Sequence, residues 1–485
     1  PAGGFVAVVT KQIEAGRALT DIYPARFCTL CRKEDAMSKQ RIQLSDHFTY
    51  SRLLRFVLPC IGTMLFTSIY GIVDGLCVSN FVGKTAFAAV NLIMPLPMLL
   101  GTIGFMLGTG GSAIVGITLG EGDQKKADRY FTLFLLAALV SVSVLAVLGI
   151  VFLRPIAVLL GAKGELLDYA VRYGRILMVS LPTFALQNMF QSFFVTAEKP
   201  HLGFWFTVGA GCTNMVLDVL MVGVWGWSVE GAAIATFISQ LVGGVLPVFY
   251  FIDRSNSSRL HLCKTSFYSK VLRDACINGS SELMTNLSMS LVNILYNYQL
   301  LRLAGENGVA AYGVIMYAAF LFVAVFVGYA VGSAPIVSFH YGARNHAEVH
   351  NLYRKSLRLI AVVAVTLTLA SMFIIPCVAR VFVGYDAELL ALTSRAFRLY
   401  ALSFLIMGFN VYASSFFTAL GDGVTSALIS FLRTLAFQVI AILLLPMLLG
   451  IDGIWLAVTA AELAALAVSA AMLLTKDKVF HYRKV

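Results

Sequence analysis

Charged residues are scarce in this 485-residue sequence, at 13% of the chain. A soluble domain of ordinary composition carries about 25%. Hydrophobic residues make up 59%, and the few charges fall between long apolar runs. This distribution excludes an ordinary soluble fold and predicts an all-α integral membrane protein. The net charge of +11 fits an anionic membrane surface rather than nucleic acid, because the basic residues lie at the ends of the apolar runs.

Signatures of catalysis are also missing. The sequence contains no HExxH, no GxSxG and no P-loop. The one His inside an apolar run, His340, lies near the end of that run. Cys28 and Cys31 form a single CxxC without a second Cys pair or a His cluster, which is weak evidence for a metal site. We therefore expect no enzymatic activity and no resident cofactor.

What the sequence does have is long apolar runs. About 20 residues of helix cross the roughly 30 Å of hydrocarbon in a bilayer. Twelve runs reach this length, near residues 53–79, 86–119, 127–153, 168–196, 201–224, 230–252, 271–302, 308–341, 352–382, 389–419, 424–449 and 453–475. With a cytoplasmic N-terminus, the connections on the same side hold most basic residues, such as Lys125, Lys126, Arg129, Lys199, Arg254, Arg259, Lys264, Lys270, Arg273, Arg344, Arg354, Lys355 and Arg358. The positive-inside rule then predicts that both termini are cytoplasmic.

An internal repeat divides these runs into two sets of six. At an offset of 222 residues, Gly83, Ala88, Ala89, Ile93 and Met94 recur as Gly305, Ala310, Ala311, Ile315 and Met316. The same offset relates Thr196-Ala197 to Thr418-Ala419 and Gly231 to Gly453. Because six is even, both halves enter the membrane in the same sense. We expect a parallel repeat about an axis along the membrane normal, with the substrate path between the halves.

The repeat predicts the domain organisation. We expect an N-terminal extension and cytoplasmic lead-in at 1–51, an N-lobe of six helices at 52–253, a basic cytoplasmic linker at 254–270, a C-lobe of six helices at 271–476 and a cytoplasmic tail at 477–485. Residues 1–36 mix charges into a short apolar run, whereas the sequence from Met37 onward resembles a natural protein start. We therefore expect residues 1–36 to be an upstream extension or otherwise non-native.

Two carboxylates stand out inside the apolar runs of the N-lobe. A charge at the centre of a bilayer costs at least about 2.5–3.5 kcal/mol, so Asp74 and Asp218 require an explanation. Asn214 and Asp218 are spaced i, i+4 and share one helix face. Thr236 offers a hydroxyl from the next run. These four oxygen-bearing residues predict a coupling site that binds Na⁺ or holds a shared proton; the residues leave that choice open.

Further polar residues lie in other runs. Glu282 stands two to three turns from the predicted cytoplasmic end, so it either faces substrate or is solvated or structural. Glu462 is the repeat partner of Gln240, and we include both among possible transport residues. Arg433 is the most deeply placed cation, and we interpret it as a structural partner for a carboxylate or for carbonyls.

These residues resemble the MATE (multidrug and toxic compound extrusion) family, in its bacterial drug/cation antiporter branch. The resemblance covers nearly everything after about residue 45. It is carried by Tyr70-Gly-Ile-Val-Asp74 with Gly83 and Ala88-Ala89-Val90, by Asn214-Met-Val-Leu-Asp218 with Gly231-Ala-Ala-Ile-Ala-Thr236, and by Pro446 through Gly450-Ile-Asp-Gly453-Ile-Trp455. It implies two lobes that alternate in access, and a cation site at Asp74, Asn214, Asp218 and Thr236. Tyr296 and Ile440 stand at the repeat positions of Asp74 and Asp218, so coupling is expected mainly in the N-lobe.

The function implied is export of cationic, amphipathic drugs by antiport with Na⁺ or H⁺, by a monomer in the bacterial plasma membrane. The abundance of Phe, Tyr and Met suits such substrates, through cation–π contacts and adaptable packing. The alternative is a lipid-linked oligosaccharide flippase of a related superfamily. That function calls for several basic residues along the cavity, and few lie within the runs. An intramembrane enzyme would need a nucleophile–base pair, which the sequence lacks. A channel would be distinguished from a carrier by an ion flux far above carrier rates.

Overall fold

The computed structural model describes residues 42–81, 84–384 and 386–483, and Leu44–Val485 forms one compact unit. Residues 1–36, Cys28 and Cys31 lie outside the described residues. Every regular element described is helical. The N-lobe contains α3 Tyr50–Phe81, α4 Lys84–Ile93, α5 Pro95–Gly120, α6 Gln124–Leu159, α7 Glu165–Thr196, α8 Pro200–Asp218, η1 Val219–Val224, α9 Ser228–Gly244 and α10 Leu246–Ile252. The C-lobe contains α11 Ser269–Asn278, α12 Ser280–Gly342, α13 His346–Val383, α14 Ala387–Ala401, α15 Phe404–Ala419, α16 Gly423–Phe431, η2 Leu432–Ala436, α17 Phe437–Leu449, α18 Ile451–Thr475 and α19 Asp477–Phe480.

These helices account for all twelve predicted runs. Within the described residues, nine helices are long and apolar enough to cross a membrane, and the pair α14 and α15, bent by 46°, adds a tenth. The 63-residue α12 holds two runs, because Gly305 bends it with φ 60° and ψ −150°, a conformation that is essentially restricted to glycine. The remaining run is α7, whose first turns carry the charged residues Glu165, Asp168, Arg172 and Arg175. The chain is thus a multi-pass membrane protein.

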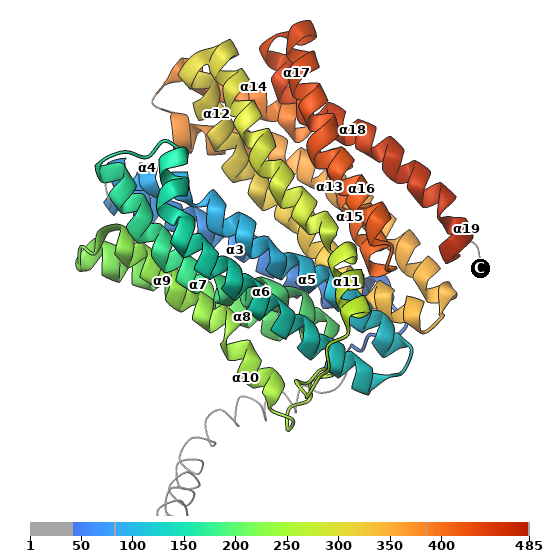
Figure 1. Ribbon diagram of the computed structural model, residues 1–485. Helices are drawn as coiled ribbons and strands as arrows, with labels where there is room; N and C mark the ends of the chain where they lie inside the picture. Colours follow the sequence, from blue (N-terminus) through green and yellow to red (C-terminus); the bar gives the residue numbers. More distant parts are fainter. Residues whose placement is uncertain (1–41, 82–83, 385, 484–485) are drawn as a thin grey trace, which may run out of the picture. The chain divides into compact units, whose positions relative to one another are not determined.

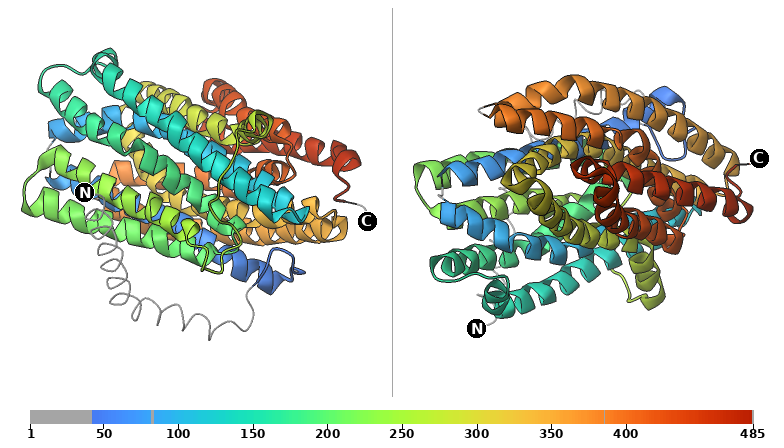
Figure 2. Two further views of the ribbon diagram at one scale, coloured as in Figure 1. Left: turned by 60° about the horizontal axis from the view of Figure 1, so that its bottom comes forward. Right: turned by 90° about the horizontal axis from the view of Figure 1, so that it is seen from above.

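The helices of the two halves form two groups, seen as blue-to-green and yellow-to-red ribbons in Figure 1 and from above in Figure 2. In the N-lobe, α7 packs against α5, α6 and α9, and α3 packs against α8. In the C-lobe, α12 packs against α15 and α16, and α17 packs against α18. The main contacts between the halves are those of α3 and α5 with α12.

The halves come into close backbone contact where α5 and α12 end. A Cβ placed on Gly120 would lie 2.0 Å from the carbonyl oxygen of Phe339, and a Cβ on Gly342 would lie 2.1 Å from that of Ile117. The offset of 222 relates Gly120 to Gly342 and Ile117 to Phe339, so the two contacts are copies of each other across the repeat axis. Small residues allow this approach of membrane helices. We call these four residues the crossing point.

The segments that lead into each half lie at the same end of the helices and dock on the opposite half. Before α3, Phe48 N and His47 Nδ1 bond to the Glu348 carboxylate of α13, at 2.9 Å and 2.6 Å. Before α11, the backbone N–H of His261 donates to the Asp128 carboxylate of α6 at 3.1 Å. Arg259 of this second segment forms an ion pair with Glu198 at 2.5 Å. The halves are therefore held together at the end predicted to be cytoplasmic.

Candidate functional site

The Asp218 side chain is the most enclosed carboxylate of the N-lobe. It ends α8 and precedes the π-helical turn η1, a local feature frequent at functional sites. The side chain has no exposed surface, and neither carboxylate oxygen has a hydrogen-bond partner among the described residues. Asn214 lies one turn earlier on the same face, is 2% exposed, and its Nδ2 also lacks an acceptor. Buried polar atoms are rarely left in this state without a functional reason.

Asp74 approaches Asp218 from α3. The two carboxyl groups lie close enough to interact directly, and both also interact with the phenol of Tyr173 on α7. Asp74 is partly exposed, unlike Asp218. The Tyr173 hydroxyl in turn lies 3.8 Å from Met94 Sδ. The structure thus brings the two predicted aspartates together, and the neighbours that interact with them in the described part of the chain, each other and Tyr173, carry no positive charge.

Gly211 explains why α3 and α8 come so close. A Cβ at this position would lie 2.5 Å from the Phe66 ring and 3.1 Å from the Tyr70 ring. Gly211 therefore allows the aromatic rings of α3 to pack directly on the α8 backbone. One turn beyond Tyr70 is Asp74, and two turns beyond Gly211 is Asp218, so this close packing places the two carboxyl groups opposite each other.

Thr236 and Gln240 lie on α9, which packs against α7 and α8 and also touches α3. Thr236 is partly buried, and Gln240 is 8% exposed with no partner for its Oε1. Within the described chain, no hydrogen bond connects either side chain to Asp74 or Asp218. The helix that carries them is adjacent to the aspartates, but direct ligation by Thr236 or Gln240 stays a prediction.

The C-lobe holds its carboxylate differently. Glu462 of α18 has no exposed surface. Its Oε1 accepts a hydrogen bond from Arg433 Nε at 2.8 Å, and its Oε2 accepts one from Asn410 Nδ2 at 2.7 Å. Arg433 is therefore the structural partner of a carboxylate, as the sequence indicated. Glu282, partly exposed on α12, interacts with the same guanidinium.

Sequence reasoning missed three of the polar residues at these sites. Asn410, which bonds Glu462, lies at the repeat position of the buried Asn188, and this pairing of two intramembrane amides was a usable pattern. Tyr173 and Tyr400, which interact with the N-lobe aspartates and with Glu462 respectively, could not be selected from the 19 tyrosines of the chain. Their positions depend on helix packing that a single sequence does not contain.

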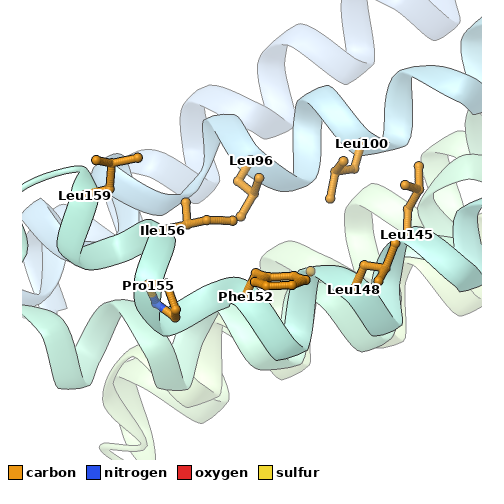
Figure 3. A pocket seen from close by; sticks show the side chains of 9 residues that line it. Leu96, Leu100, Leu145, Leu148, Phe152, Pro155, Ile156 and Leu159 are labelled. Atoms are coloured by element: carbon orange, nitrogen blue, oxygen red, sulfur yellow. The ribbon is translucent and has the colours of Figure 1, made fainter.

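An apolar groove of about 360 Å³ lies between α5 and α6. Figure 3 shows Leu96 and Leu100 on one side, and Phe152, Pro155 and Ile156 on the other. No lining residue is polar, and several side chains of α6 here, such as Leu159 at 86%, are largely exposed. On a membrane-spanning helix such exposure means contact with lipid. The groove has none of the polar groups that would orient a drug.

The oxygen chemistry of the N-lobe fits a small hard cation. Within the described residues there is no group of three or more His, Cys, Asp or Glu that could hold a metal ion. This leaves two carboxyls, supplemented by neutral amide and hydroxyl oxygens. Such a set suits Na⁺ or a shared proton better than a transition metal, which prefers imidazole or thiolate.

Comparison with known sequences agrees with the repeat. The sequence model of the family described as MatE matches residues 59–220 and again residues 283–444, and so matches each half separately. The chain is 21% identical over 436 residues to the multidrug export protein MepA of Staphylococcus saprophyticus, covering 89% of this chain and 95% of that protein. It is 22% identical over 433 residues to MepA of Staphylococcus aureus, with coverages of 89% and 95%.

Solved structures with a similar fold include a crystal structure of MATE in complex with MaL6, with a TM-score of 0.85 and 22% identity over 90% of this chain and 98% of that chain. Another is an outward-facing conformation of a multidrug resistance MATE family transporter of the MOP superfamily, with a TM-score of 0.84 and 22% identity over 90% and 97%. The family match spans more than half of the chain. The chain therefore belongs to the MATE family of efflux transporters, with twelve membrane-spanning helices in two six-helix lobes.

Proposed function

We propose that this transporter exports cationic, amphipathic drugs in exchange for Na⁺ or H⁺, and that Asp74 and Asp218 carry the coupling ion. The observation that supports this most is the pair of facing carboxyls, of which Asp218 is enclosed and has no hydrogen-bond donor. Two adjacent carboxylates in a poorly polarisable environment repel each other and are costly to desolvate. Neutralisation by a shared proton or a bound cation relieves both penalties.

Coupling follows if the ion and the drug favour different states of the two lobes. A ligand shifts a conformational equilibrium only by its difference in affinity for the two states. In the present conformation the lobes touch at the crossing point and at the lead-in segments, at the end predicted to be cytoplasmic, and also where Gly279 meets Met106 further along α5. This supports a state open to the outside, in which an ion enters the N-lobe while the drug leaves.

Asn214 and Thr236 offer neutral oxygen ligands, which favour Na⁺ as the coupling ion. The facing carboxyls alone suit a proton equally well. The relatives named above are multidrug export proteins, which supports a broad range of small-molecule substrates for this chain as well. The flippase alternative has less support, because the buried Arg433 is already paired with Glu462.

The experiment is transport by the purified chain in proteoliposomes, with Na⁺ and pH gradients imposed separately and ethidium as the exported cation. We expect Asp218→Asn and Asp74→Asn to abolish ion-driven export while melting temperature and reconstitution stay normal. Asp168→Asn, at an exposed position in the first turn of α7, is the matched control and should transport normally. If both site variants export ethidium at the control rate under either gradient, the proposed coupling site is wrong.

A further inference from the structure

The repeat places an acidic residue in the C-lobe where the N-lobe has an amide. The offset of 222 residues relates Asn188 to Asn410 and Gln240 to Glu462. In the N-lobe, Asn188 Nδ2 and Gln240 Oε1 both lack partners among the described residues. In the C-lobe, the equivalent pair is joined by a hydrogen bond of 2.7 Å and carries a negative charge. The C-lobe thus contains a buried carboxylate, the kind of group that we propose exchanges an ion at Asp218.

Both oxygens of the Glu462 carboxylate accept hydrogen bonds from protein side chains, Oε1 from Arg433 and Oε2 from Asn410. In addition, Asn410 Nδ2 donates a second hydrogen bond, to the backbone carbonyl oxygen of Glu462 at 2.9 Å. Asn410 is itself held by Ser469, whose Oγ donates to Asn410 Oδ1 at 2.9 Å. Asn410 and Glu462 have no exposed surface, and the Arg433 side chain is 13% exposed. Each member of the network therefore fixes the next.

The titratable and charged groups around Glu462 come from three neighbouring elements, η2, α14 and α12. Arg433 lies on η2 and Tyr400 on α14, and both interact with Glu462. Glu282 on α12 interacts with Arg433 rather than with Glu462. Tyr296, also on α12, adds a neutral phenol near Tyr400. Arg433 is therefore the one cation that we find opposite Glu462 in the described structure.

The N-lobe has no room for an arginine at the position equivalent to Arg433. The repeat partner of Arg433 is Gly211, and even a single Cβ there would lie 2.5 Å from the Phe66 ring. No arginine could occupy that position while α3 and α8 keep their packing. A guanidinium also does not release its proton in proteins. One lobe therefore carries a permanent, tethered cation, and the other has facing carboxyls without one.

We propose that Arg433 is a built-in counter-cation that occupies the C-lobe carboxylate permanently, so that Glu462 neither binds nor releases a coupling ion during transport. This inference rests on the proposed coupling role of Asp74 and Asp218, because it explains why coupling is confined to their lobe. Without Arg433, Glu462 becomes a buried carboxylate without a cation. Such a group must take up a proton or a metal cation to remain buried. Loss of Arg433 is thus expected to create a second exchangeable site.

The first test uses the full chain with Asp74→Asn and Asp218→Asn, in which the N-lobe site is disabled. Ion binding is measured on the purified protein by ²²Na⁺ retention and by proton uptake between pH 8 and pH 6. We expect Arg433→Gln in this background to gain a bound Na⁺ or proton. The gain should disappear when Glu462→Gln is added, and should be absent in Arg433→Lys, which keeps the charge. An Arg433→Gln protein that binds no more ions than its background overturns the proposal.

A second measurement keeps the test decisive if Arg433→Gln does not fold. The neutral pair Arg433→Gln/Glu462→Gln retains hydrogen-bonding groups without charges, in a chain with an intact N-lobe. We expect its ratio of ions to drug molecules to equal that of the wild type, and a reduced ratio would mean that Glu462 exchanges an ion after all. Failure of the proposed function looks different: the variant with Asp74→Asn and Asp218→Asn would then still couple transport to an ion gradient, whatever happens at Arg433.

Discussion

The crossing point of α5 and α12 predicts that one methyl group can shift this transporter between its states. Gly120→Ala would place a Cβ 2.0 Å from the Phe339 carbonyl oxygen, and Gly342→Ala would place one 2.1 Å from that of Ile117. Real Cβ contacts essentially never fall below 3.0 Å. Because the opposing atoms are backbone atoms of a helix, they cannot rotate away. The ends of α5 and α12 must separate.

The magnitude follows from the cost of inserting a methyl group into a packed interface, typically about 1–3 kcal/mol. The penalty falls only on the conformation in which the lobes touch here, since the opposite state separates them at this end. A difference of about 1–3 kcal/mol corresponds to roughly a 5- to 150-fold shift in the equilibrium. The repeat relates the two contacts, so both variants should shift the equilibrium in the same direction and by similar amounts.

The assay is the distance between spin labels placed on the two lobes near the crossing point, measured with and without ion and drug. We expect Gly120→Ala and Gly342→Ala to enrich the state in which this end is open. Gly313→Ala is the control, because a Cβ at this helical glycine has no atom within 4 Å. Unchanged distance distributions in both variants, with the control also unchanged, would refute the idea that this contact closes the cytoplasmic side.

Two further predictions concern stability. Burial of the Asp422 carboxyl tends to raise its pKa, but hydrogen bonds from Lys476 and Thr425 outweigh burial and hold the pKa below its usual value. The stability contributed is therefore present above the unfolded pKa of about 3.9 and is lost as pH falls through the lower folded pKa, so Asp422→Asn should flatten the decline in melting temperature between pH 5 and pH 3. Gly305→Ala should lower the midpoint of thermal unfolding through backbone strain of about 1–3 kcal/mol at its positive φ. The cause would be strain rather than a clash, because a Cβ there has no atom within 4 Å. An unchanged midpoint would mean that α12 relaxes without cost.

The sequence predicted the membrane-spanning architecture well, because hydropathy and the repeat are properties of the chain itself. Each of the twelve predicted runs corresponds to helical structure. The breaks inside them were not predicted. The π-helical turn after Asp218 and the bend between α14 and α15 leave the average hydropathy unchanged, so no pattern of apolar residues reveals them.

The candidate site was predicted in part for the same reason. Asp74 and Asp218 are exceptional as charges in apolar runs, and the structure brings them together. Whether Thr236 joins them depends on the rotation of α9 against α8, which no sequence period fixes. Likewise, Arg433 and Glu462 were each visible as intramembrane charges, but their pairing through Asn410 requires three helices to meet.

A duplicated fold produces two equivalent halves, and this chain uses the equivalence selectively. At the crossing point the repeat is preserved, and the two glycines make the same contact from both sides, so each lobe contributes an equivalent backbone surface to the closed end. At the buried carboxylates the repeat is broken. If both lobes exchanged an ion, two sites would have to bind and release their ions together in each transport cycle. In the roles proposed above, a tethered guanidinium removes that requirement from the C-lobe, because Arg433 already pairs with Glu462, and it leaves the change in ion occupancy to Asp74 and Asp218.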